Sequence, residues 1–117
     1  MYTKHPMDKR VRRIMGDYVY LYEDYCKWVK KQRAVQGIDD SQQARIVKAI
    51  EQASVGIGED IFNDEIRENL KKAVYLSCID RNEYNFDAFA GTIGCERTRF
   101  HQYKNEFLYN IKLNLGM

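Results

Sequence analysis

The sequence lacks the cysteine and histidine patterns that mark disulfide-stapled and zinc-binding proteins. Its three cysteines, Cys26, Cys78 and Cys95, are odd in number and far apart, and none forms a C-x-x-C pair. The two histidines, His5 and His101, complete no zinc pattern. We therefore expect free, buried thiols in a reducing cytosol, and neither a metal nor any other cofactor.

Long apolar runs and linker-like segments are also missing. No apolar stretch approaches the roughly 18 residues of a membrane helix, and the N-terminus MYTKHPMDKRVRR lacks the apolar region of a secretion signal. Only one proline is present, and there is no Ser/Gly-rich linker. With 117 residues, 44% of them hydrophobic, the chain is long enough for one domain with its own core. We expect a cytoplasmic protein that makes no membrane contact.

Catalytic motifs are absent as well. The sequence contains no G-x-S-x-G, no Walker loop and no G-x-G-x-x-G. Gly56-Ile57-Gly58 begins like a dinucleotide fingerprint, but the third glycine is missing and no strand pattern precedes it. We expect that the protein is not an enzyme.

The net charge of +2 conceals a gradient along the chain. Residues 1–37 have a balance of +5, residues 38–85 of −4 and residues 86–117 of +1. The strongest basic cluster comprises Lys9, Arg10, Arg12 and Arg13. Such a cluster can contact phosphates or an anionic protein surface, but it can equally be a solvated helix start.

Apolar residues recur at three- and four-residue steps, which predicts an all-α fold with about five helices. A long N-terminal helix of about 40 Å is expected from Asp8 to Gln36, with a stop at Gly37. Further helices are expected over 42–55 and 64–80, with Asp8, Ser41, Asn63 and Asn85 as N-caps of the helices that follow them. The aromatic stripe of the first helix favours core packing, with a subunit contact as the alternative. We divide the chain into an N-terminal region, 1–60, for dimerisation or a partner, and a DNA-binding region, 61–117.

The segment Phe86–Leu113 is typical of a helix-turn-helix. A short helix leads to a turn at Gly94, where a positive φ suits glycine, and a longer helix follows. From Arg97 to Lys104 the polar positions include three cations and no acid, as in a recognition helix. A structural helical hairpin is the alternative. The expected motif core is Phe89, Ala90, Ile93, Gly94, Phe100 and Tyr103.

From about Asn69 to Gly116 the chain resembles the C-terminal region of RinA/ArpU-type regulators, small phage-encoded activators with a helix-turn-helix similar to region 4 of sigma factors. The resembling stretch is AVYLSCIDRNEYNFDAFAGTIGCERTRFHQYKNEFLYNIKLNLGM. Two positions depart from the family pattern. Phe89 stands where Ile or Leu is usual, and Glu96 stands where the recognition helix commonly starts with Ser or Thr, so its cap must come from elsewhere.

The resemblance and the motif together predict a sequence-specific DNA-binding transcriptional regulator, a late-gene activator of phage or prophage origin, in the cytoplasm of a bacterial host. The expected partner is double-stranded DNA, with RNA polymerase and a second copy of the chain as further candidates. The expected base contacts are Arg97, Thr98, His101 and Gln102. The expected phosphate contacts are Arg99, Lys104 and Tyr109. The alternatives are a phage-encoded helical adaptor that binds a protein and a small terminase-type packaging protein.

Overall fold

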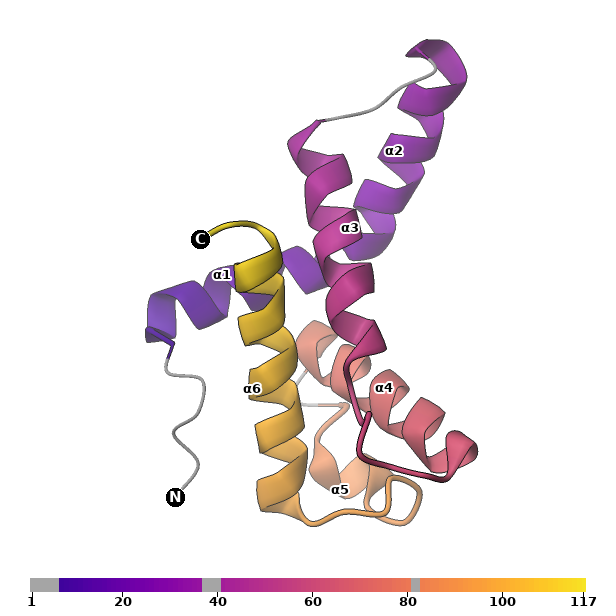
Figure 1. Cartoon of the computed structure of the whole chain (residues 1–117), viewed down its shortest axis with the longest axis vertical. Coiled ribbons are helices and arrows are strands. Elements are labelled where there is room, and N and C mark those ends of the chain that lie inside the picture. Colours follow the sequence, from indigo (N-terminus) through magenta and orange to yellow (C-terminus); the bar gives the residue numbers. More distant parts are fainter. Residues whose placement is uncertain (1–6, 37–40, 81–82) are drawn as a thin grey trace.

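The structure, a computed structural model, describes residues 7–36, 41–80 and 83–117, and helices connected by turns and loops make up these ranges. Six helices occur there and no strand, which confirms the all-α fold predicted with about five helices (Figure 1). The helices are α1 (Lys9–Tyr20), α2 (Tyr22–Gln36), α3 (Gln42–Val55), α4 (Asp64–Ile79), α5 (Phe86–Phe89) and α6 (Arg97–Asn114).

Short polar side chains cap four of these helices at the N-terminus. Each side-chain oxygen accepts a hydrogen bond from a backbone N–H of the first turn, at 2.7 to 3.2 Å. These bonds satisfy donors that would otherwise lack an intrahelical partner. The capping residues are Asp8 for α1, Ser41 for α3, Asn63 for α4 and Asn85 for α5, as the sequence predicts.

The expected single N-terminal helix is divided at Leu21, so the prediction of one long helix is wrong. Backbone hydrogen bonds continue through the break, from Leu21 N–H to Asp17 O and from Tyr25 N–H to Leu21 O. On either side of it the helices have different partners, since α1 packs against α4 and α6 whereas α2 packs against α3. Tertiary packing therefore bends a segment whose local periodicity is continuous. The stop predicted at Gly37 lies outside the described residues.

One hydrophobic core joins the two regions distinguished in the sequence. Met15 from region 1–60 and Leu70 and Ile111 from region 61–117 are fully buried in the same cluster. Helix α6 runs through the centre of the molecule and packs against α3, α1 and α4. The two regions thus fold around shared contacts.

The aromatic stripe of α1 and α2 contributes in part to this core. Tyr18, Tyr22 and Tyr25 are half-buried and pack against it, whereas Tyr20 and Trp28 are exposed. Tyr22 also donates a hydrogen bond to Glu51 of α3 at 3.2 Å, outside the core. Core packing thus accounts for most of the stripe.

Helices α2 and α3 form a hairpin whose outer half projects from the body of the molecule, while the inner part of α3 packs on α6 (Figure 1). The body consists of α1, α4, α5 and α6, and the longest dimension of the whole is 46 Å. None of the helices seen in the described ranges combines the length and the hydropathy that a membrane span requires.

Candidate nucleic-acid interface

The chain bends sharply at Gly94, between α5 and α6, as the helix-turn-helix prediction requires. Gly94 has a φ of +64°, and a Cβ built there lies 3.1 Å from a methyl group of Ile66 on α4. The turn is also tied to α4 by a hydrogen bond from the Asn69 side chain to Thr92 O at 3.1 Å. Helix α5 has only four residues, so α4 is the main support of the turn.

Three of the six predicted motif-core residues are buried, and Ala90 and Gly94 are exposed. Ile93, Phe100 and Tyr103 have exposed fractions of 0%, 1% and 6%, and Phe89 is half-buried against the core. Ala90 is exposed, so its assignment to the motif core is wrong. Helix α5 ends one residue before Ala90, which leaves this residue in the turn.

The first turn of α6 presents polar side chains to solvent. Arg97, Thr98 and His101 are all exposed. Glu96, the N-cap residue, makes no side-chain capping hydrogen bond, which agrees with its departure from the Ser or Thr expected there. Backbone donors of the first turn are therefore not satisfied by the cap side chain.

Arg97 is held at the surface by contacts with α5. Its guanidinium forms an ion pair with Asp87 at 2.7 Å and lies over the ring of Phe86, 5.1 Å from the centroid. The Arg97 and Asp87 side chains are 59% and 70% exposed. An ion pair as exposed as this one is weak, so Arg97 can exchange Asp87 for another acceptor at little cost.

Arg99 and Gln102 lie in a separate cluster with the segment that precedes α4. Arg99 forms an ion pair with Asp60 at 2.8 Å, stacks over Tyr103 and donates to Gln102 at 3.0 Å. Tyr103 donates a second hydrogen bond to Asp60 at 2.9 Å. Burial raises the pKa of Asp60, but the hydrogen bonds from Arg99 and Tyr103 outweigh it, so this pKa is lowered overall. The base contact predicted for Gln102 and the phosphate contact predicted for Arg99 would have to compete with this cluster, and we leave both residues out of the interface.

The two remaining predicted phosphate contacts are also engaged within the chain. Lys104 donates to the backbone carbonyl of Ser77 at 3.2 Å, and Ser77 is buried in α4. Tyr109 is half-buried, with the ammonium group of Lys112 5.5 Å from its ring centroid. Of these two, only Lys104 lies beside the cleft described next.

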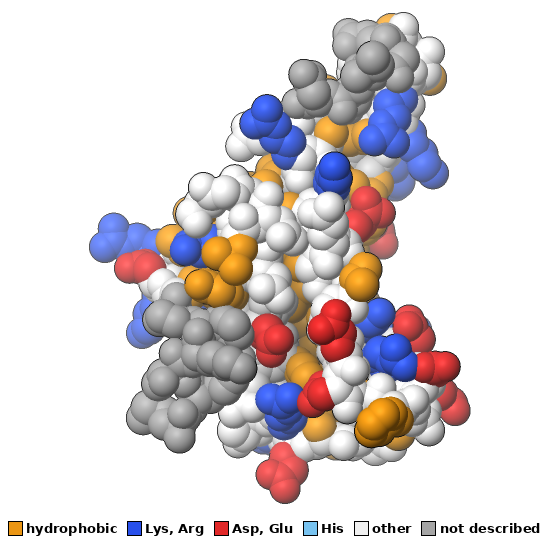
Figure 2. Space-filling view, in the orientation of Figure 1, with side chains coloured by type: hydrophobic (Ala, Val, Ile, Leu, Met, Phe, Trp, Pro, Cys, Tyr) orange, Lys and Arg blue, Asp and Glu red, His pale blue; other side chains and the backbone are white. Residues whose placement is uncertain are grey.

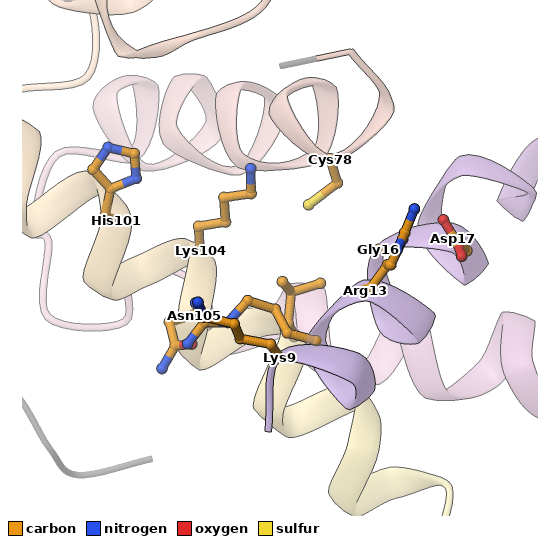
Figure 3. Close-up of a pocket in the computed structure, with 10 residues that line it drawn as sticks. Lys9, Arg13, Gly16, Asp17, Cys78, His101, Lys104 and Asn105 are labelled. Carbon is orange, nitrogen blue, oxygen red and sulfur yellow. The ribbon is translucent and has the colours of Figure 1, made fainter. Parts of the chain in front are cut away.

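The fold brings the basic cluster of α1 next to α6, which the sequence alone did not indicate. The two helices and the end of α4 line an open cleft of about 880 Å³ (Figure 3). In Figure 3, His101 and Lys104 extend from α6, Cys78 lies on α4, and Lys9, Arg13 and Asp17 extend from α1. Asp17 is the one acid among the lining residues. They are Lys9, Arg12, Arg13, Gly16, Asp17, Cys78, His101, Lys104, Asn105 and Leu108.

The helix dipoles add to the positive potential near this cleft. Neither α1 nor α6 has an acidic residue in its first turn, where the partial positive charge of the dipole favours one. Helix α4 starts with Asp64 and Glu65, but only its C-terminal end lines the cleft. The N-cap carboxylates of Asp8 and Glu96 offset part of this positive charge, and an anion bound beside the cations would be attracted by the remainder.

His101 responds to the same positive environment. Burial lowers its pKa, and the charges of Lys104 and Arg97 lower it further. At neutral pH the ring is therefore largely neutral, with one nitrogen available to donate and the other to accept.

The described residues show no sign of a metal centre. Across 7–36, 41–80 and 83–117, no three His, Cys, Asp or Glu side chains gather as ligands. The three cysteines are free, as expected, and half-buried rather than fully buried. Burial raises the pKa of Cys95, which disfavours its thiolate.

Comparison of the chain with protein-family models, with curated proteins and with solved structures finds no match.

Proposed function

We propose that this protein binds double-stranded DNA through the surface formed by α1 and the first half of α6. The observation that carries the proposal is the basic cleft, in which Lys9, Arg12 and Arg13 of α1 lie beside His101 and Lys104 of α6. Cations gathered on one face are the electrostatic footprint of a nucleic-acid-binding protein.

In this proposal the start of α6 enters the major groove. Arg97, Thr98 and His101 are exposed on its first two turns, and residues at the N-terminal end of a recognition helix are those that meet base edges. Arg97 would leave Asp87 and bind a guanine, a contact that contributes about 1–3 kcal/mol of discrimination between bases.

The cations of α1 would hold the phosphate backbone beside that groove. Asp8, the N-cap of α1, offsets part of the cost of these cations to helix stability, and bound phosphate would offset more of it. Backbone contacts of this kind fix the register of a protein on DNA, and base contacts then read the sequence.

The regulatory role is the part of the proposal that depends on the resemblance of residues 69–116 to RinA/ArpU-type regulators. On that basis we propose a transcriptional regulator of phage or prophage origin, active in the bacterial cytoplasm. RNA polymerase and a second copy of the chain are its proposed protein partners. A dimer would read two half-sites, one helical turn or a multiple of it apart.

The test is DNA binding by the double variant R12Q/R13Q, measured by fluorescence anisotropy over a range of salt concentrations. The wild-type affinity should fall steeply with salt, and loss of two phosphate contacts should reduce the slope of log K against log [salt] by about 1.8. The control is K71Q/K72Q, which removes the same charge from α4, where neither lysine lines the cleft. Equal slopes for the two variants, or wild-type binding that is insensitive to salt, would contradict the proposal and favour a protein adaptor.

A further inference from the structure

The outer half of the α2–α3 hairpin carries a second group of cations, far along the chain from the cleft. Six Lys and Arg side chains are exposed there, and no acid occurs within 25–36 or 41–50. Figure 2 shows Lys and Arg side chains over the upper part of this hairpin and a concentration of Asp and Glu on the lower body. The hairpin cations are Lys27, Lys30, Lys31 and Arg33 on α2, and Arg45 and Lys48 on α3.

Local helix electrostatics does not account for the cations on α3. Arg45 lies in the first turn of this helix, which has no acidic residue, so its charge opposes the helix dipole. None of the six cations forms an ion pair with an acid in the described part of the chain. An anionic partner bound to this surface would be attracted by all six charges.

The outer half of α2 buries little apolar surface. Among the described residues of α2, Val29 is the one buried hydrophobic residue, with 4% of its surface exposed. Lys27, Lys30 and Lys31 are spaced at i, i+3 and i+4, so they share one face of the helix. That face is exposed, opposite the side of α2 that carries Val29.

We infer that this hairpin contacts the phosphate backbone of DNA that flanks the segment bound by α1 and α6. The inference rests on the proposed function and extends it to a second, sequence-independent contact. Lysine is depleted at protein–protein interfaces, whereas protein–DNA interfaces are strongly positive, and four of the six cations are lysines. A phosphate backbone is therefore a better match than an acidic protein surface.

Two double variants, each of which replaces a pair of adjacent lysines by glutamine, test the inference. K30Q/K31Q removes two charges from α2, and K71Q/K72Q removes two from the middle of α4. Lys30, Lys31 and Lys72 are exposed and Lys71 is half-buried. Lysine and glutamine have similar helix propensities, so circular dichroism should show the same fold for both variants.

Binding is measured on two duplexes, at several salt concentrations. On a duplex of about 25 base pairs, K30Q/K31Q should reduce the salt slope by about 1.8, and K71Q/K72Q should not. A duplex of about 10 base pairs is about 34 Å long at 3.4 Å per base pair, which is shorter than the 46 Å molecule. On that duplex K30Q/K31Q should bind like the wild type.

Each other result overturns the inference. If K30Q/K31Q and K71Q/K72Q behave alike on the long duplex while R12Q/R13Q loses slope, the proposed function stands and the hairpin is not a DNA contact. If K30Q/K31Q instead changes self-association in sedimentation with DNA binding intact, the hairpin partner is a protein. If the wild type binds neither duplex, the proposed function fails together with this inference.

Discussion

Replacement of Asp87 by asparagine should strengthen DNA binding, because Asp87 competes with DNA for Arg97. The two side chains form an ion pair at 2.7 Å, and with 59% and 70% of their surfaces exposed the pair contributes about 0.2–1 kcal/mol. The wild-type protein gives up that free energy when Arg97 leaves Asp87 to bind a base. In D87N there is no ion pair to break, so this cost of binding disappears. The substitution also removes a negative charge that repels phosphate. The affinity should rise about 1.4- to fivefold from loss of the ion pair, since 1.4 kcal/mol corresponds to tenfold.

The assay is fluorescence anisotropy on a duplex selected by retention from a random-sequence pool. The matched control is D64N, which also removes an exposed first-turn acid paired with an arginine, Arg67, but at the start of α4. The variant R97A should bind at least severalfold more weakly than wild type while folding normally, and D87N should give a smaller gain when added to it, because only the relief of phosphate repulsion remains. An equal gain for D64N and D87N, or a full gain in the R97A background, would refute the role of Arg97 as a reader.

Three further predictions concern the turn, the core and pH. Phe100→Ala should lower stability by about 3–5 kcal/mol and the Tm by about 10 °C or more, because Phe100 is 1% exposed; an unchanged thermal melt would contradict its place in the core. Gly94→Ala should lower the free energy of unfolding by at least about 1–2 kcal/mol, because φ is +64° and the new Cβ would crowd Ile66. Gly16→Ala should raise it by about 0.5–1 kcal/mol, because Gly16 lies inside α1 with open space around it. Equal effects of the two variants in urea denaturation would contradict this prediction. The wild-type affinity for DNA should rise as pH falls from the pKa of His101 in the complex to its lower pKa in the free protein, because nearby phosphate raises this pKa and the complex binds more protons than the free protein. The rise should be about tenfold per unit of pKa difference, and a His101→Gln variant that keeps the full pH dependence in the same anisotropy assay would exclude His101 as its source.

Local signals in the sequence account for much of the fold. Capping by Asp8, Asn63 and Asn85 depends on side chains within a few residues of the helix start, so these boundaries could be predicted. The positive φ at Gly94 and the burial of Phe100 follow from the same kind of short-range pattern.

Features that depend on distant contacts could not be predicted in this way. The break at Leu21 has no local marker, because it arises where α1 and α2 pack on different helices. The pairing of Arg99 with Asp60 joins positions 39 residues apart. The cleft requires α1 and α6 to lie side by side, so the cluster at Lys9–Arg13 and the start of α6 read as unrelated features in the sequence.

A two-dimensional NMR titration of the protein with a duplex of about 15 base pairs tests the DNA-binding surface most directly, since about 50 Å of DNA spans the molecule. We predict that backbone amide signals from the first turns of α1, around Arg12 and Arg13, and from Thr98 and His101 of α6 shift with added DNA. Signals from the acidic start of α4, around Glu65, should stay in place. Shifts confined to α4, or no shifts at low salt, would contradict the account.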